Sequence, residues 1–271
     1  MGSKIEWTEH TWNPVTGCSN VSPGCKNCYA RAFATRLKAM RVPGYENGFQ
    51  PTIHGDRLGE PVVRQRPTLY FVNSMSDLFH EEVPFNYIDA VFDVIDKTPH
   101  HQYQILTKRQ HRMEAYFARR ASPPNAWVGV SVENRKHGLP RIDVLRGIAA
   151  AIRFLSVEPL LEALGEFDLT GIDWVIVGGE SGHRARPMRP EWVRSIRDLC
   201  AGAKVPFFFK QWGAWGPDGI KRSKGANGRI LDGRTWDALP FHSPPFRKGQ
   251  NIEHDEIQLA GWSDTPGVGH A

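Results

Sequence analysis

The sequence predicts an α/β fold: a partial or complete (β/α) barrel of the TIM type, with about six to seven parallel strands and an irregular C-terminal extension. Three observations support this prediction. Apolar runs alternate with helical patterns along residues 68–211, each run ends in polar residues, and 271 residues suffice for one such barrel. A doubly wound open sheet is the alternative, but no Gly-x-Gly-x-x-Gly follows the first strand.

The chain opens with a short expected strand within residues 5–12, followed by a cysteine-rich loop and a helix. Apolar residues recur at helical spacing after the loop, over residues 30–40. Residues 41–68 hold several glycines and prolines without a period. They therefore indicate a long connecting loop, and such loops are often functional.

Six more strands are expected, each a short apolar run typical of a buried parallel strand. Helical patterns lie near residues 88–95, 113–118 and 142–145, and a further helix begins at Pro190, since proline suits the first turn. The C-terminal ends of parallel strands meet at one edge, where a barrel keeps its active site. The six runs are residues 68–72, 103–106, 126–130, 152–155, 173–177 and 206–209.

The pattern changes after residue 212, which divides the chain into an expected barrel domain, residues 1–212, and an irregular basic cap or tail, residues 213–271. Residues 213–229 are rich in glycine, lysine and arginine. Residues 230–236 predict a small hairpin with Asp232-Gly233 as its turn. Residues 242–271 show no clear period.

Composition narrows the class of protein. A hydrophobic fraction of 40% can build a sizeable core, and the net charge of +5 suits nucleic acid or phosphorylated substrates. The N-terminus has no apolar signal region, and no apolar run is long enough to span a membrane. We therefore expect a cytoplasmic protein without membrane contact, in which clustered cysteines bind metal rather than form disulfides.

Three of the four cysteines, Cys18, Cys25 and Cys28, follow a C-x6-C-x2-C spacing. Three thiolates can hold three irons of a [4Fe–4S] cluster and leave the fourth iron open. Zinc is the alternative metal, with His10 or His54 as a fourth ligand; the third possibility is three unligated thiols. Cys200 lies on the apolar face of a predicted helix and is expected in the core.

The chain resembles the radical S-adenosylmethionine superfamily, whose commonest motif is C-x3-C-x2-C. The six-residue first spacing departs from that motif, and the C-x2-C-Tyr ending is closer to the branch that includes spore photoproduct lyase. More specifically, the chain is similar to a phage-associated radical-SAM-like family of unestablished substrate. The resemblance rests on residues 12–18, 73–80, 106–109, 156–160 and 177–182.

The resemblance implies a mechanism. S-adenosylmethionine chelates the open iron, an electron cleaves its sulfonium, and the resulting 5′-deoxyadenosyl radical abstracts hydrogen from a substrate. An electron donor of the flavodoxin or ferredoxin type is then also required.

Polar residues at the strand ends are the expected cofactor contacts. By the resemblance, Asp77 with Ser74 or Ser76 accepts from the methionyl ammonium, and Lys108 pairs with the carboxylate. Several of these residues also have a purely structural interpretation: Asp77 as a helix cap, Lys108 as a solvated residue, Glu158 as a salt-bridge partner and Gly178-Gly179 as a tight turn. Ser131 and Glu133 are assigned to the ribose and the two glycines to adenine. The complete set is Ser74, Ser76, Asp77, Thr107, Lys108, Ser131, Glu133, Glu158, Gly178, Gly179 and Glu180.

Residues 221–224, Lys-Arg-Ser-Lys, are the expected nucleic-acid contact, with Trp212, Trp215 and Trp236 nearby for base stacking. A solvated surface with core tryptophans is the alternative. The resemblance implies a radical SAM enzyme, and with this basic stretch we expect it to modify or repair a nucleic acid or nucleotide. The alternative function is a non-catalytic iron–sulfur or zinc protein that binds nucleic acid or a protein partner.

Overall fold

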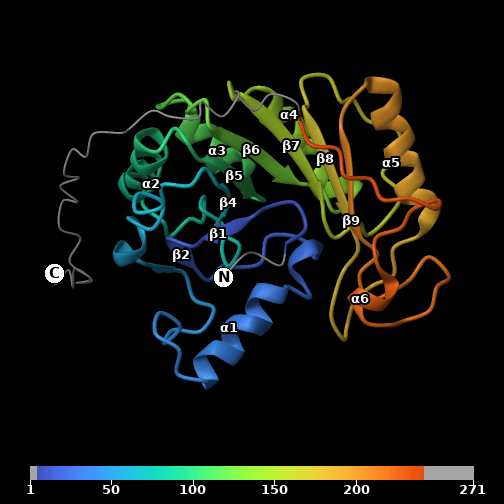
Figure 1. The fold of residues 1–271 in the computed structure, drawn as a ribbon, viewed down its shortest axis with the longest axis horizontal. Coiled ribbons are helices and arrows are strands. Elements are labelled where there is room, and N and C mark those ends of the chain that lie inside the picture. The colour runs from blue at the N-terminus through green and yellow to red at the C-terminus, as the bar shows by residue number, and fades with distance from the viewer. Residues whose placement is uncertain (1–4, 241–271) are drawn as a thin grey trace.

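The computed structural model describes residues 5–240 and shows a curled half-barrel of seven parallel strands flanked by helices (Figure 1). The strand order is β1-β4-β5-β6-β7-β8-β9, with every neighbouring pair parallel. The predicted fold class is confirmed. The strands of the half-barrel are β1 (His10–Trp12), β4 (Leu69–Val72), β5 (Gln102–Thr107), β6 (Ala126–Ser131), β7 (Ile152–Val157), β8 (Trp174–Gly178) and β9 (Phe207–Gln211).

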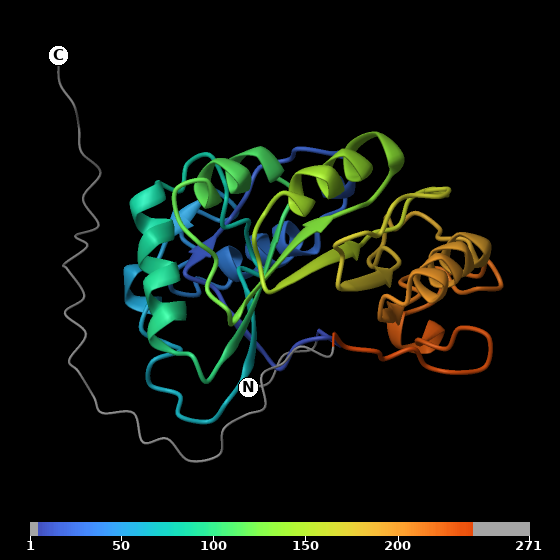
Figure 2. The same ribbon diagram turned by 90° about the horizontal axis from the view of Figure 1, so that it is seen from above.

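The helices α2 to α5 lie on the outside of the curled sheet, as Figure 2 shows. A right-handed crossover between parallel strands places each helix on that face. Segment 158–173 connects β7 to β8 without a helix. The helices are α1 (Tyr29–Ala39), α2 (Phe85–Lys97), α3 (Gln110–Phe117), α4 (Arg135–Arg146), α5 (Pro190–Ala203) and α6 (Lys224–Asn227). None of the helices within residues 5–240 is long and apolar enough to cross a membrane.

The first strand is shorter than expected, because only His10–Trp12 pairs with β4. The preceding residues turn across the concave face, where Trp7 packs against Phe71 at a centroid distance of 4.7 Å. Trp7, Phe71, Phe154 and Trp174 belong to a second, inner apolar cluster, while the larger core lies between the sheet and the outer helices. The half-barrel therefore has apolar packing on both faces.

The cysteine-rich loop leaves β1 through a small antiparallel ribbon, β2 (Val15–Thr16) with β3 (Thr52–Ile53). A 3-10 turn, η1 (Pro23–Cys25), lies inside the loop, and a second, η2 (Gly55–Arg57), follows β3. The expected connecting loop, residues 41–68, thus contains one strand and one 3-10 turn.

The described part of the C-terminal cap, residues 213–240, packs on β8 and β9. The amide of Phe209 donates to the carbonyl of Trp236 at 2.9 Å, and Trp174 Nε1 donates to the carbonyl of Ala238 at 2.8 Å. The predicted hairpin is confirmed, since Leu231 bridges Arg234 and the turn residues Asp232 and Gly233 both have positive φ. The domain division at residue 212 stays a prediction, and residues 241–271 lie outside the described part.

Candidate functional site

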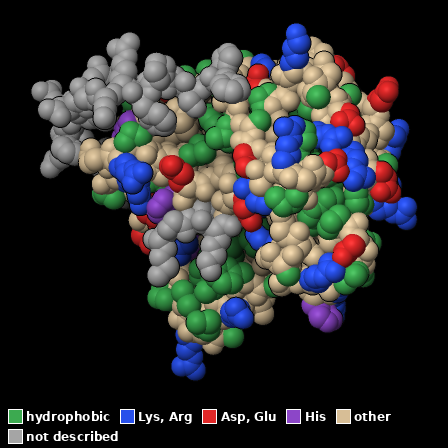
Figure 3. All heavy atoms as spheres, turned by 45° about the vertical axis from the view of Figure 1, so that its right-hand side comes forward, with side chains coloured by type: hydrophobic (Ala, Val, Ile, Leu, Met, Phe, Trp, Pro, Cys, Tyr) green, Lys and Arg blue, Asp and Glu red, His purple; other side chains and the backbone are tan. Residues whose placement is uncertain are grey.

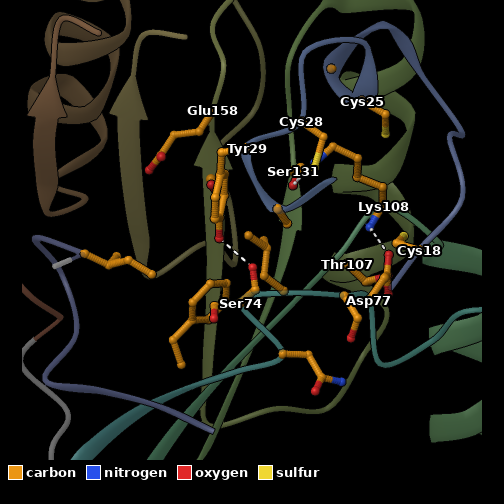
Figure 4. Close-up of a pocket in the computed structure, with 18 of the residues that line it drawn as sticks. Cys18, Cys25, Cys28, Tyr29, Ser74, Asp77, Thr107, Lys108, Ser131 and Glu158 are labelled. Atoms are coloured by element: carbon orange, nitrogen blue, oxygen red, sulfur yellow. Dashed lines mark hydrogen bonds between the residues drawn. The ribbon is translucent and has the colours of Figure 1, made fainter. Parts of the chain in front are cut away.

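A cavity of about 200 Å³ lies at the C-terminal edge of the strands, between the sheet and the cysteine loop (Figure 4). Parallel register brings the ends of β5, β6 and β7 to this edge, where Thr107 is level with Val130 and Ser131 with Ser156. Ten of the predicted site residues line the cavity: Cys18, Cys25, Cys28, Ser74, Ser76, Asp77, Thr107, Lys108, Ser131 and Glu158.

Gly17 fixes the position of Cys18. Its φ is +80°, and a Cβ built there would lie 2.0 Å from the carbonyl oxygen of Gln50. The amide of Gly17 donates to the carbonyl of Met75 at 3.0 Å, and the amide of Cys18 donates to the carbonyl of Phe49 at 3.1 Å. Glycine is therefore required at position 17, and Cys18 is held by backbone contacts on two sides.

Cys25 ends the turn η1, and Cys28 is the residue before α1. Between them, Asn27 donates from Nδ2 to Glu180 Oε2 at 3.0 Å and to the carbonyl of Arg184 at 2.8 Å. These contacts tie the loop to the segment after β8. The loop is thus anchored at both ends, and its three thiols are free and partly exposed.

Arg109 is the buried cation beside the cysteine loop. It donates from Nη1 to Cys18 Sγ at 3.4 Å, from Nη2 to Ser19 Oγ at 2.8 Å and from Nε to Glu81 at 2.8 Å. Burial raises the pKa of the Cys18 thiol to about 11, with a further contribution from Asp77, while Arg109 opposes this rise. A positive charge therefore faces the thiol that a metal would deprotonate.

Asp77 connects the end of β4 to the end of β5. Its Oδ1 accepts from Thr107 Oγ1 at 2.7 Å, and its Oδ2 accepts from the Lys108 amide at 3.1 Å and from Arg109 at 3.2 Å. Oδ1 also accepts from the amide of Phe79 at 3.1 Å, as in a local turn. Both carboxylate oxygens are occupied by protein donors, so the contact of Asp77 with a ligand ammonium stays a prediction.

Lys108 extends into the cavity and donates from Nζ to Ser131 Oγ at 3.0 Å (Figure 4). It forms no ion pair with any carboxylate of residues 5–240. Lys210, from β9, instead pairs with Glu158 Oε2 at 2.5 Å, while the other oxygen, Oε1, is buried without a hydrogen-bond partner among the described residues. The cavity therefore has one ammonium available to an anion and one unsatisfied acceptor.

The two serines after β4 line the cavity, but their hydroxyls already donate to the chain before the cysteine loop. Ser76 Oγ donates to the carbonyl of Val15 at 3.0 Å, and Ser74 Oγ donates to Asn13 Oδ1 at 3.1 Å. The carbonyl of Ser74 accepts from the hydroxyl of Tyr29 at 2.5 Å. Their predicted contacts with the cofactor remain untested.

Glu133 and Glu180 lie behind the loop and do not line the cavity. Glu133 is fully buried and pairs with Arg141 at 2.6 Å, while Glu180 pairs with Arg186 at 2.5 Å. Burial alone would raise the pKa of Glu133, but the charge and hydrogen bonds of Arg141 lower it. A Cβ on Gly24 of the loop would lie 3.1 Å from Glu133 Cγ. Both carboxylates thus support the cysteine loop.

The predicted glycine pair also lies outside the cavity lining. A Cβ on Gly179 would lie 2.0 Å from the carbonyl oxygen of Trp212, and one on Gly178 would lie 3.3 Å from Glu158 Cδ. The pair therefore permits close approach of the chain after β9 and of the Glu158 side chain, and its contact with adenine stays a prediction.

Sequence reasoning assigned no site role to Tyr29, Asn73 or Trp7, which also line the cavity. Asn73 has a φ of +59°, accepts from the Val15 amide at 3.1 Å and leaves Nδ2 buried without a partner among the described residues. Two of these residues could have been found from their position in the sequence, because Tyr29 directly follows Cys28 and Asn73 directly follows a predicted strand.

The residues present fit an iron–sulfur cluster by their chemistry. Three partly exposed thiols border one cavity, and a buried guanidinium offsets the negative charge that thiolates and cluster bring. Within residues 5–240 no three His, Cys, Asp or Glu side chains surround one ion position. The histidines considered for zinc do not line the cavity: His54 contacts Thr16 at 2.8 Å and His10 contacts Arg64 at 3.1 Å.

Fold and site define a (β/α) half-barrel protein with a cysteine loop over the C-terminal edge of its sheet. The chain belongs to a family described as a protein of unknown function, DUF5131, whose model matches residues 2–240. No curated protein matches the sequence.

Among solved structures, the chain is similar to spore photoproduct lyase complexed with dinucleoside spore photoproduct, at 14% identity and a TM-score of 0.43, covering 73% of this chain and 62% of that one. A lyase mutant with bound AdoMet and dinucleoside spore photoproduct matches at 13% identity and a TM-score of 0.41, covering 63% and 56%. This chain thus spans less than two thirds of either lyase chain.

Proposed function

We propose that this protein is a radical S-adenosylmethionine enzyme that acts on a nucleic acid or nucleotide. One observation carries the proposal: the three cysteines of the C-x6-C-x2-C loop border the same cavity as the strand-end residues of β5, β6 and β7. Polar groups gathered at that edge are where (β/α) barrels place their chemistry.

Cys18, Cys25 and Cys28 would hold three irons of a [4Fe–4S] cluster. When bound, the cluster supplies one electron, taken from a flavodoxin- or ferredoxin-type donor, for the cleavage of S-adenosylmethionine to methionine and a 5′-deoxyadenosyl radical. Arg109 holds Cys18 in place and compensates negative charge. The side chains around the cavity keep water from the reacting atoms.

Lys108 is the residue best placed to bind the methionyl carboxylate, because its ammonium lies in the cavity and contacts only the Ser131 hydroxyl among the described residues. Glu158 Oε1, buried without a partner there, offers an acceptor to a hydroxyl or amine of the ligand. The Lys210–Glu158 pair forms the wall of the cavity on the β7 and β9 side.

The test is cofactor cleavage. Anaerobically reconstituted protein of verified iron and sulfide content, incubated with dithionite and S-adenosylmethionine, is expected to release 5′-deoxyadenosine. Cys25→Ala is the matched negative control. If the cluster-loaded protein never cleaves the cofactor, the proposed enzymatic activity is wrong and the alternative, a non-catalytic binding protein, remains. If the protein binds zinc instead, the proposed iron–sulfur cluster is wrong.

A further inference from the structure

The basic stretch of residues 221–224 is already engaged within the protein. Arg222 pairs with Asp218 at 2.6 Å and Lys224 pairs with Glu6 at 2.5 Å, while Lys221 donates to the carbonyl of His183. The three nearby tryptophans donate from Nε1 to backbone carbonyls, and Trp212 is buried. The structure therefore gives this stretch little free charge or ring surface for a nucleic acid.

Residues 26–45, which include α1, have the opposite character. They contain five cations, all exposed, and no carboxylate: Lys26, Arg31, Arg36, Lys38 and Arg41. None of the five forms an ion pair with a carboxylate of the described residues. Among the described residues, the Arg31 side chain contacts Asn20 Oδ1, at 2.7 Å, and the ring of Phe49. The segment thus presents uncompensated positive charge.

The same helix exposes large apolar side chains. Tyr29 is 57% exposed, Phe33 46% and Met40 65%. With Arg36 they occupy positions i, i+4, i+7 and i+11, which share one face of a helix. Two aromatic rings with an arginine between them and the end of the helix form a surface suited to base stacking and phosphate contact.

The face begins at the cavity. Tyr29 lines the cavity with the three cysteines and donates its hydroxyl to the carbonyl of Ser74. The helix α1 extends away from the row of strands at the lower end of Figure 1. The lower end of the molecule in Figure 3 shows hydrophobic and basic side chains and no acidic ones.

We propose that this α1 face, Tyr29, Phe33, Arg36 and Met40 with the adjoining Arg41, binds a single-stranded nucleic acid and leads one nucleotide into the cavity. Its role as a substrate-binding surface rests on the proposed function. Bases stack on Phe33 and Tyr29, and the cations contact the phosphates. An acidic protein partner could pair with the cations of this face. It would not explain why the aromatic residues of the face extend to Tyr29, which lines the cavity.

The test is binding of fluorescein-labelled 20-nucleotide dT and rU strands to the full-length, cluster-loaded protein, followed by fluorescence anisotropy over a salt series. The double variant Arg36→Gln/Arg41→Gln is expected to weaken binding and to flatten the slope of log K against log salt by about 1.4, since each single-strand phosphate contact contributes about 0.7. Phe33→Ala is expected to weaken binding at least about fivefold without changing that slope.

The matched control is Arg66→Gln/Lys97→Gln, which also removes two exposed cations that form no ion pair with described carboxylates. It is expected to bind the strands like the wild type. Equal loss in both double variants, or no binding by the wild type, would overturn the proposal. If the α1-face variants lost binding to an acidic flavodoxin but bound the dT and rU strands like the wild type, the surface would be a protein-docking surface and the proposal would be overturned. Cofactor cleavage without added substrate is measured separately, so failure of the enzyme and failure of this surface are distinguishable.

Discussion

Arg109 donates a hydrogen bond from Nη1 to the Sγ of Cys18 at 3.4 Å, and the same nitrogen contacts Asp77 Oδ2 at 3.2 Å. The side chains of Arg109 and Asp77 are 4% and 8% exposed, so this ion pair is buried. One guanidinium therefore joins the end of β5, the end of β4 and the cysteine loop.

Arg109→Gln is expected to destabilise the protein by about 3–5 kcal/mol, because it leaves the Asp77 carboxylate buried without its cation. Urea unfolding measures the effect. Arg222→Gln, which removes an exposed ion pair with Asp218, is the control and should leave the midpoint unchanged. The double variant Asp77→Asn/Arg109→Gln should recover part of the loss. A wild-type midpoint for Arg109→Gln would contradict a stabilising role for the pair.

Gly17→Ala is expected to lower iron loading and thermal stability. A Cβ there would lie 2.0 Å from the Gln50 carbonyl, and a left-handed conformation costs a non-glycine residue about 1–2 kcal/mol. The resulting backbone shift would displace Cys18. Gly59→Ala is the control, since a Cβ at Gly59 would meet no atom within 4 Å. Full iron content in Gly17→Ala would show that the loop tolerates the shift.

Cys25→Ala is expected to abolish cluster assembly, whereas Cys200→Ala should keep the iron and sulfide content of the wild type. Cys25 lines the cavity, while Cys200, a residue of α5, is fully buried and burial raises the pKa of its thiol to about 12. Iron and sulfide analysis after anaerobic reconstitution measures both. A fully loaded Cys25→Ala protein would exclude Cys25 as a ligand.

Lys108→Met is expected to weaken S-adenosylmethionine binding about tenfold or more while leaving the cluster in place, because a hydrogen bond to a charged group contributes about 1.5–3 kcal/mol. Equilibrium dialysis on the loaded protein measures the affinity. Lys97→Met removes an exposed lysine of α2 and serves as the control. Unchanged affinity in Lys108→Met would assign the carboxylate to another residue.

Acidification is expected to remove stability that depends on Glu133. Arg141 lowers the pKa of Glu133 below its ordinary 4.5 in the folded protein, despite the opposing effect of burial. Its stabilisation is therefore present above pH 4.5 and is lost as the pH falls through the lowered folded pKa. Glu133→Gln should be less stable at pH 7 and lose less stability on acidification. Urea midpoints over a pH series test this, with the exposed Glu166→Gln as control; parallel curves for Glu133→Gln and wild type would contradict it.

Local sequence patterns predicted a partial or complete barrel of parallel strands and the cysteine loop. The apolar runs at residues 126–130 and 173–177 form the buried strands β6 and β8. Such runs can be read from the local sequence, because a strand buried on both faces needs apolar residues along its whole length. Polar strand ends such as Lys108 and Glu158 reached one cavity, since parallel strands end at a common edge.

The folded chain determines which polar strand-end residues face the cavity and which support the cysteine loop. Glu133 and Glu180 follow strands just as Glu158 does, yet Arg141, from α4, and Arg186, beyond β8, pair with them behind the loop. The basic stretch of residues 221–224 forms ion pairs with Asp218 and Glu6 and a hydrogen bond to the His183 carbonyl. The cations of α1 form no ion pair with a carboxylate of the described residues. The Lys224–Glu6 pair joins residues 218 apart in the sequence, and even the pairs four to eight residues apart depend on side-chain directions that apolar patterns do not specify.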